Sequence, residues 1–126
     1  MSLDVSDFTS VLRIEQPVAH LVVSGELDAF TAEQVSHHVA RARTSGCVHV
    51  RMDLGGVSFI DAAGVGLLVR LRRTARSSDQ TLEVVAASEF VRRLCTLLGL
   101  AEVVGVDPAP WRRHEAATQL PSAAAQ

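Results

Sequence analysis

The sequence contains no lysine, because all twelve of its Lys and Arg positions are arginine. Chemistry that depends on a lysine side chain is therefore excluded. Long apolar runs are missing too: no stretch approaches ~20 residues without a charge, and no charged-then-apolar leader opens the sequence. We therefore expect neither a membrane span nor a signal peptide, and we expect a cytoplasmic protein.

Strong net charge and metal-type clusters are also lacking. A net charge of −2 and a pI near 6.2 give no general attraction for nucleic acid or an anionic membrane. Cys47 and Cys95 lie far apart without metal-ligand spacing, so we expect both to be reduced, buried and inert. The five histidines have no nucleophile motif or metal spacing around them. We predict no metal, no cofactor and no enzymatic activity.

The remaining composition favours one domain. With 126 residues and 48% hydrophobic content, the chain can form one domain with a core and is too short for two. Apolar runs at 11–15 and 19–23 predict an antiparallel strand pair, and capping-box spacing from Thr31 predicts a helix that ends at Ser45–Gly46. The further predicted elements are strands at 47–54 and 82–86, helices at 62–77 and 88–98, and a short edge strand at 103–106.

The end of the chain has a different pattern. Pro108 and Pro110 interrupt the alternation of strands and helices. We expect residues 1–107 to form the domain, and we assign 108–126 to a terminal helix at 111–120, whose tryptophan packs on the core, and a frayed tail.

Residues 53–66 are the most informative stretch. Gly55 and Gly56 are expected to end the strand, and a second apolar run at 57–60 leads to Asp61, which is placed to cap a helix opened by Ala62. A helix start carries unpaired amides and the positive end of the helix dipole. An anion, or an acidic group of a partner, is therefore favoured next to Ala63 and Gly64.

Two blocks of sequence resemble the signature of STAS domains, the anti-sigma-factor antagonist family. One is Val57–Ile60 followed by Asp61–Gly66, and the other is Ser24–Asp28 followed by Thr31–Glu33. Their order and spacing over residues 8 to 107 make the match more specific than either block alone. The resemblance implies an α/β STAS fold, with a mixed central β-sheet and α-helices packed mainly on one face.

A missing hydroxyl separates this chain from the family pattern. The family's signature normally reads Asp-Ser-Ser/Thr-Gly-Leu-Gly, and an ATP-dependent anti-sigma kinase phosphorylates the second hydroxyl residue. That position is Ala63 here, and its neighbour Ala62 offers no substitute. The nearest hydroxyl is Ser58, which we interpret as a structural serine in a buried strand rather than a phosphorylation site. Our hypothesis is that the chain is a permanently unphosphorylated binder, or a family member controlled in some other way; the alternatives are a plain helix start in a scaffold module and an engineered alanine.

The helix at 62–77 presents two different stripes. One, with Leu68 and Leu71, is expected to face the sheet. The other, with Ala63, Leu67 and Arg70, is expected to form a docking surface with a charged rim. The resemblance and this stripe together predict a partner-binding set of Gly25, Glu26, Leu27, Asp28, Ser58, Asp61, Ala62, Ala63, Gly64, Leu67 and Arg70.

Two functions remain open. The first is an antagonist that binds an anti-sigma factor and serine kinase of the histidine-kinase-like ATPase type; the second is a STAS scaffold subunit of a stress-signalling assembly or a lipid-transport complex. The intact Gly25–Asp28 block favours the first, and the lost phosphoacceptor favours the second. A response-regulator receiver centred on Asp53 is disfavoured because it needs a lysine, and nucleotide binding is disfavoured because no glycine-rich phosphate loop is present.

Overall fold

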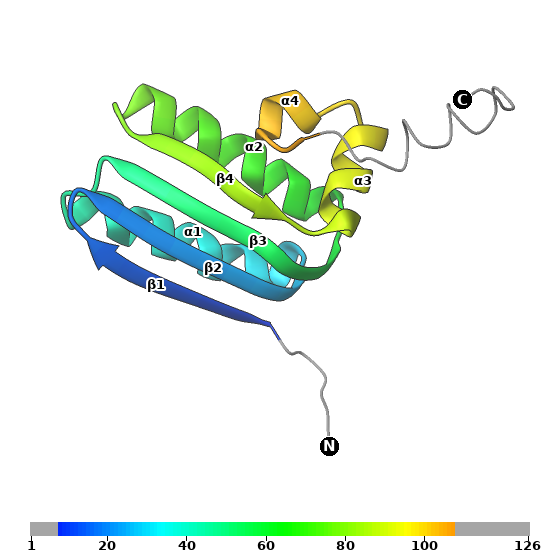
Figure 1. The fold of residues 1–126 in the computed structure, drawn as a ribbon, viewed down its shortest axis with the longest axis horizontal. Helices are drawn as coiled ribbons and strands as arrows, with labels where there is room; N and C mark the ends of the chain where they lie inside the picture. The colour runs from blue at the N-terminus through cyan, green and yellow to red at the C-terminus, as the bar shows by residue number, and fades with distance from the viewer. Residues whose placement is uncertain (1–7, 108–126) are drawn as a thin grey trace, which may run out of the picture.

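The fold is built on a four-stranded sheet in the order β1-β2-β3-β4, and the computed structural model describes residues 8–107 (Figure 1). β1 and β2 are antiparallel, whereas β2, β3 and β4 run parallel. The elements are β1 (Thr9–Glu15), β2 (Val18–Leu27), α1 (Ala29–Thr44), β3 (His49–Ile60), α2 (Ala62–Ser77), β4 (Thr81–Ala87), α3 (Glu89–Leu97) and α4 (Ala101–Val104). The predicted mixed sheet and the opening antiparallel pair are confirmed.

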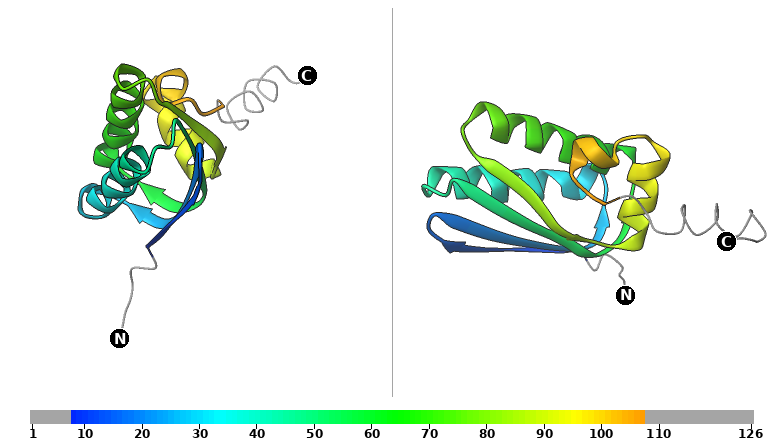
Figure 2. Two further views of the ribbon diagram at one scale, coloured as in Figure 1. Left: turned by 90° about the vertical axis from the view of Figure 1, so that its left-hand side faces the viewer. Right: turned by 45° about the horizontal axis from the view of Figure 1, so that its top comes forward.

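The helices α1 and α2 lie side by side on one face of the sheet (Figure 2). The side chains of β2 point alternately to the two faces of the sheet. Leu21 and Val23 are therefore fully buried beneath α1, while Val22 is exposed on the other face. Full burial of an apolar side chain of this size stabilises the folded state by about 1.5–3 kcal/mol. The core therefore lies between the sheet and the two helices, as the family resemblance implies.

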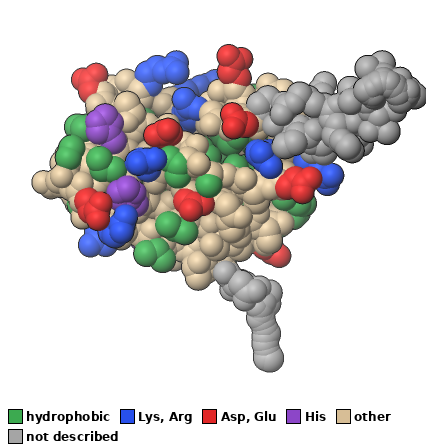
Figure 3. Space-filling model, in the orientation of Figure 1, with side chains coloured by type: hydrophobic (Ala, Val, Ile, Leu, Met, Phe, Trp, Pro, Cys, Tyr) green, Lys and Arg blue, Asp and Glu red, His purple; other side chains and the backbone are tan. Residues whose placement is uncertain are grey.

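The uncovered face of the sheet carries charges of both signs. Arg13 and His20 both lie within ion-pair distance of Glu15, and Arg51 lies near Glu83. Figure 3 shows these interspersed acidic, basic and apolar side chains on the face turned toward the viewer. Acidic and basic side chains are therefore paired with one another on that face.

Helix α2 has the bounds that the sequence predicts, but α1 begins earlier than expected. Its N-cap is Asp28, whose Oδ1 accepts from the amides of Phe30 (3.0 Å) and Thr31 (2.9 Å). The prediction that the capping box starts at Thr31 is wrong, because Thr31 is the N3 residue of a box that starts at Asp28. Ser45 ends the helix as expected.

Strand β3 does not end at its glycines. It continues from His49 to Ile60 through Gly55 and Gly56, with register shifts against both neighbouring strands. The carboxylate of Asp53 accepts from the amide of Gly55 at 2.8 Å, which accommodates the irregular stretch. The prediction of a strand end here is wrong, and the continued strand places Ser58 on the surface, where it is exposed rather than buried.

The predicted edge strand at 103–106 is also wrong. Residues Ala101–Val104 form the short helix α4, and the amide of Val104 donates to the carbonyl of Leu100 at 2.9 Å. Gly105 then takes a left-handed conformation with φ 91°. Val104 and Val106 are buried, so their apolar character serves helix packing instead of strand pairing. The predicted helix at 111–120 lies outside the described residues.

Both cysteines are buried, as expected, and neither forms a disulfide. Cys95 lies in α3, where burial raises the pKa of its thiol to about 11. A thiol with that pKa forms little thiolate at neutral pH, so Cys95 is a poor nucleophile.

Candidate functional site

The parallel pairing of β2 and β3 brings the two signature blocks together. Leu27 at the end of β2 pairs with Ile60 at the end of β3. The next residues, Asp28 and Asp61, are the N-caps of α1 and α2. Two segments more than thirty residues apart in sequence therefore meet at one edge of the sheet (Figure 1).

Asp61 caps the start of α2. Its Oδ1 accepts from the amide of Gly64 at 2.9 Å, and its carbonyl accepts from Val65 at 3.0 Å. The side chains of Ala62 and Ala63 are exposed just beyond this cap. The first amides of a helix have no acceptor within the helix, and together with the helix dipole they favour a negative group. The predicted cap and helix start are confirmed.

Glycine is required at position 64 by close packing. A Cβ there would lie 2.5 Å from the carbonyl oxygen of Leu27 and 2.7 Å from Cγ1 of Ile60. The start of α2 therefore rests directly on the ends of β2 and β3. Gly25 is buried in β2 with φ 94°, a conformation that favours glycine. Gly25, Gly64 and Leu27 are buried, so they shape this edge rather than line its surface.

The start of α1 is more fully closed. Besides the two amides bound by Asp28, the hydroxyl of Thr31 donates to the carbonyl of Glu26 at 2.8 Å. The hydrogen bond from the Thr31 amide is the main cause that lowers the pKa of Asp28. Asp28, which we predicted to contact a partner, is therefore engaged in capping, whereas the side chain of Glu26 is exposed.

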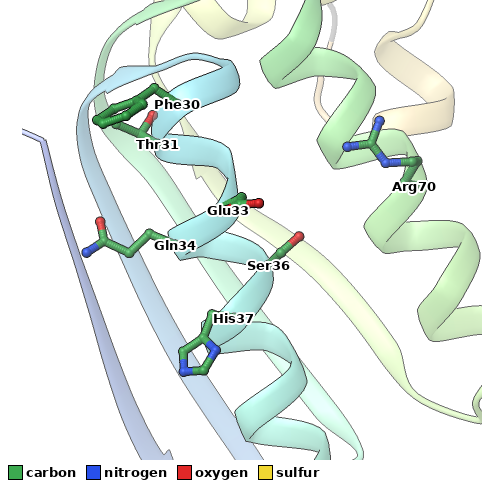
Figure 4. A pocket seen from close by; sticks show the side chains of 7 residues that line it. All are labelled: Phe30, Thr31, Glu33, Gln34, Ser36, His37 and Arg70. Carbon is green, nitrogen blue, oxygen red and sulfur yellow. The ribbon is translucent and has the colours of Figure 1, made fainter.

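A surface hollow runs along the junction of α1 and α2 (Figure 4). Figure 4 shows Glu33 and Ser36 of α1 on the side facing α2, with Arg70 of α2 opposite them. The wide outer part is about 1000 Å³ in volume and is lined by Phe30, Thr31, Glu33, Gln34, Ser36, His37 and Arg70. A narrower part of about 190 Å³ is lined by Ala29, Ala32, Glu33, Ser36, Ala63, Leu67 and Arg70. We call the two parts together the α1–α2 groove.

The groove brings together Ala63, Leu67 and Arg70, which the sequence placed on one stripe. The expectation that Leu67 lies open on the surface is wrong, because its side chain is only 2% exposed. Packing of α1 against α2 covers it, so Leu67 forms part of the groove floor. Ser58 lines neither part of the groove.

Sequence reasoning missed Phe30. Its side chain is 91% exposed, more than that of any other large hydrophobic residue that the structure describes. It lines the wide part of the groove, and Figure 4 shows its ring on the side of α1 that points away from α2. Aromatic side chains in such positions are typical anchors of protein interfaces. A large aromatic residue two residues after a helix cap is the signal that could have revealed it.

Other kinds of site find no support within residues 8–107. No group of three or more His, Cys, Asp or Glu side chains there is placed to hold a metal ion. No helix in the same range is long and apolar enough to cross a membrane. The cytoplasmic location stays a prediction.

Comparisons with known proteins agree with the family that the two signature blocks indicate. Residues 10–105 match the family described as "Mlab, STAS domain". The anti-sigma-B factor antagonist of Staphylococcus epidermidis is 31% identical over 85 residues, which cover 68% of this chain and 79% of that protein. The corresponding antagonist of Staphylococcus aureus is 28% identical over 85 residues, with the same coverage.

Solved structures show the same fold. The anti-sigma factor antagonist SpoIIAA in its unphosphorylated form aligns with a TM-score of 0.65 and 19% identity, over 88% of this chain and 96% of that chain. An antagonist from Mycobacterium paratuberculosis aligns with a TM-score of 0.64 and 22% identity, over 87% of this chain and 93% of that chain. At these identities the likeness concerns the fold. Together with the family match and the staphylococcal relatives, it establishes that this chain belongs to the STAS domain family, alongside relatives of the anti-sigma-factor antagonist type.

Proposed function

We propose that this chain is an anti-sigma-factor antagonist that cannot be switched off by phosphorylation at its α2 start. Its partner is an anti-sigma factor of the histidine-kinase-like ATPase type, and it binds that partner without catalysing a reaction. The contact surface is the exposed edge at Glu26 and Asp61–Ala63, continued along the α1–α2 groove to Phe30 and Arg70.

The observation that carries this proposal is the exposed methyl group of Ala63. It stands two residues after the Asp61 cap, in the place of the hydroxyl that the family's signature normally has. A phosphate there would add about −1.5 to −2 charge and three acceptor oxygens. Alanine keeps this surface in the uncharged state, which in this proposal is the state that binds the anti-sigma factor.

The α1–α2 groove determines both the shape and the charge of the proposed interface. Phe30 offers an exposed aromatic anchor, and Glu33 and Arg70 place opposite charges on the two walls. Charges arranged in this way favour one orientation of a partner more than they add affinity. Loss of Phe30 should therefore weaken binding more than loss of a charged wall residue.

The test is a capture experiment that compares the wild-type chain with Ala63→Ser. Each tagged protein is incubated with lysate of the source organism, with and without Mg-ATP, and the bound proteins and phosphosites are identified by mass spectrometry. We expect both proteins to retain a histidine-kinase-like ATPase without ATP. With Mg-ATP, only the Ala63→Ser complex should dissolve, and the hydroxyl introduced by this substitution should carry phosphate.

Matched variants separate the surface from the fold. Phe30→Ala should reduce capture of the ATPase, whereas Leu97→Ala, which removes another exposed apolar side chain on α3, should not. Ala62→Ser should behave as wild type in the presence of Mg-ATP. If wild type captures no such ATPase, or if Mg-ATP dissolves its complex too, the proposal is wrong.

The second candidate function is a scaffold subunit of a stress-signalling assembly or a lipid-transport complex. The same Ala63 favours it, because a subunit without a phosphorylation switch needs no hydroxyl at this position. Capture of transporter subunits or other STAS proteins, in place of the ATPase, would support this function against the antagonist.

A further inference from the structure

A second charged surface lies on the opposite flank of α2, where the helix meets α4 (Figures 1 and 2). Two shallow hollows adjoin there and share Arg72 and Arg76. One, of about 300 Å³, is lined by Val69, Arg72, Arg73, Arg76, Glu102 and Val103. The other, of about 230 Å³, is lined by Arg72, Arg76, Gln80, Thr81 and Leu82. We call Arg72, Arg73 and Arg76 with these hollows the α2–α4 surface.

The three arginines outnumber the acidic side chains beside them, because among the described residues that line the two hollows only Glu102 is acidic. In the part of the chain that the structure describes, none of them forms an ion pair, whereas Arg13, Arg51 and Arg93 each lie within 4.0 Å of a glutamate carboxylate. Helix α2 itself contains no aspartate or glutamate. The surface is therefore a concentration of positive charge on a chain whose net charge is −2.

The like charges of the three arginines repel one another within the isolated helix. Arg76 follows Arg72 by four residues, a spacing at which like charges destabilise a helix, and Arg73 lies three residues before Arg76. The helix dipole favours a cation only in the last turn, which accounts for Arg76 but not for the other two. A ligand of opposite charge would remove the repulsion.

The surface also offers apolar contact. Val103 of α4 is 46% exposed and lines the larger hollow together with the half-buried Val69. The guanidinium of Arg72 lies directly over Gly105, where an added Cβ would overlap it, so this arginine is packed in place beside the hollow. A fixed guanidinium presents parallel donors that match a carboxylate.

We propose that the α2–α4 surface binds an acidic segment of a partner protein, with carboxylates on Arg72, Arg73 and Arg76 and an apolar side chain in the hollow between α2 and α4. Charge complementarity and the apolar floor select this occupant. The surface faces α4, whereas Arg70 and Ala63 face α1, so one partner can bind here while another occupies the α1–α2 groove. The inference therefore stands whether or not the proposed function is correct.

The experiment measures binding of a fluorescein-labelled peptide, Glu-Leu-Glu-Glu-Leu-Glu, to the full chain by fluorescence anisotropy. The control peptide has glutamine in place of glutamate. We expect the acidic peptide to bind at least ~10-fold more tightly than the control, and the affinity to fall as salt rises. Amide chemical-shift changes should fall on the second half of α2 and on α4.

Two triple variants, each of which removes three positive charges, test whether the peptide binds at the α2–α4 surface. Arg72→Gln/Arg73→Gln/Arg76→Gln should lose most of the binding, and Arg13→Gln/Arg51→Gln/Arg93→Gln should keep it within about threefold. Arg73→Gln/Arg76→Gln, which leaves the packed Arg72 in place, should also lose binding, and Arg70→Gln should not. Equal losses in the two triple variants, or no binding by wild type, would overturn the proposal. Binding of pyrophosphate or of vesicles of anionic phospholipid as tight as that of the peptide would overturn it too, by assigning the surface to phosphate groups.

Discussion

The starts of α1 and α2 lie at the same edge of the sheet and both have an aspartate cap, yet they are built differently. At α1, Asp28 binds two backbone amides, and the hydroxyl of Thr31 lies within bonding distance of the Asp28 amide and of the Glu26 carbonyl. At α2, Asp61 binds one amide, and the residues that follow are two alanines and a glycine. The first start is closed by its own side chains, whereas the second leaves the side chains of Ala62 and Ala63 exposed.

This difference separates stability from recognition. A closed cap contributes to the fold and has little left to offer a ligand, whereas an open helix start retains amides and the positive end of the dipole. We therefore expect substitutions at the α1 start to change mainly stability. Those at the exposed positions of the α2 start should change mainly binding.

The largest effect on stability is expected at the α2 start, from Gly64→Ala. The new Cβ would lie 2.5 Å from the Leu27 carbonyl oxygen, and relieving that overlap should cost about 1–3 kcal/mol of unfolding free energy. Gly66→Ala is the matched control, because its Cβ would meet nothing closer than Arg70 at 3.6 Å. Urea unfolding should show Gly66→Ala neutral or stabilised. Equal stability of the two variants would contradict the close packing.

Next in size is the loss of the closed cap through Asp28→Ala. It leaves the amides of Phe30 and Thr31 without their acceptor, so Tm should fall by several degrees in a thermal melt at pH 7. Because the pKa of Asp28 is lowered below 3.8 in the folded state, its carboxylate stabilises the fold above that pH. The contribution is lost as pH falls through the folded-state pKa. The difference between wild type and Asp28→Ala should therefore shrink in acid, and a constant difference would argue against capping by the charged form.

A smaller effect is expected from Asp61→Ala, which removes one capping bond and should cost about 0.5–1 kcal/mol. Asp61→Asn keeps an acceptor and should restore most of this stability. Chemical denaturation measures both. If Asp61→Ala is more destabilising than Asp28→Ala, the contrast between an open and a closed helix start is wrong.

The smallest expected effect is a pH dependence of stability that arises from His38 on α1. Burial, with the nearby charges of His37 and Arg41, lowers the pKa of His38 below 6.5. The unfolded chain then binds a proton more readily, so this histidine's contribution to stability is complete above pH 6.5 and declines as pH falls below it. His38→Gln should make Tm less sensitive to pH between 7.5 and 5.5, and His37→Gln, which removes one of the charges that lower this pKa, should do so to a smaller extent. An unchanged pH slope in His38→Gln would refute this assignment.

Elements whose signals are local were predicted well. The bounds of α2 and its Asp61 cap follow from a few neighbouring residues, as do the ends of α1 and α3 near Gly46 and Gly99. The cap of α1 was misplaced because Asp28 and Thr31 both begin a spacing compatible with a capping box. Only the folded backbone shows which one accepts the amide bonds.

Predictions that depend on neighbours distant in sequence were less accurate. Gly55 and Gly56 resemble a strand end, but pairing with β2 carries β3 through them. Leu67 resembles a surface residue until α1 covers it. The valines at 103, 104 and 106 favour a strand, yet α4 packs against α2 and adds no strand to β4.

The sequence by itself determined the family, the helix start at Asp61 and the alanine at position 63, because each depends on residue identity at adjacent positions. Only the tertiary structure decided that Ala63 and Arg70 share a groove with Phe30, and that Arg72, Arg73 and Arg76 form a separate surface against α4. The physical reason is that helix periodicity separates the faces of α2, whereas what each face meets depends on which helix packs beside it.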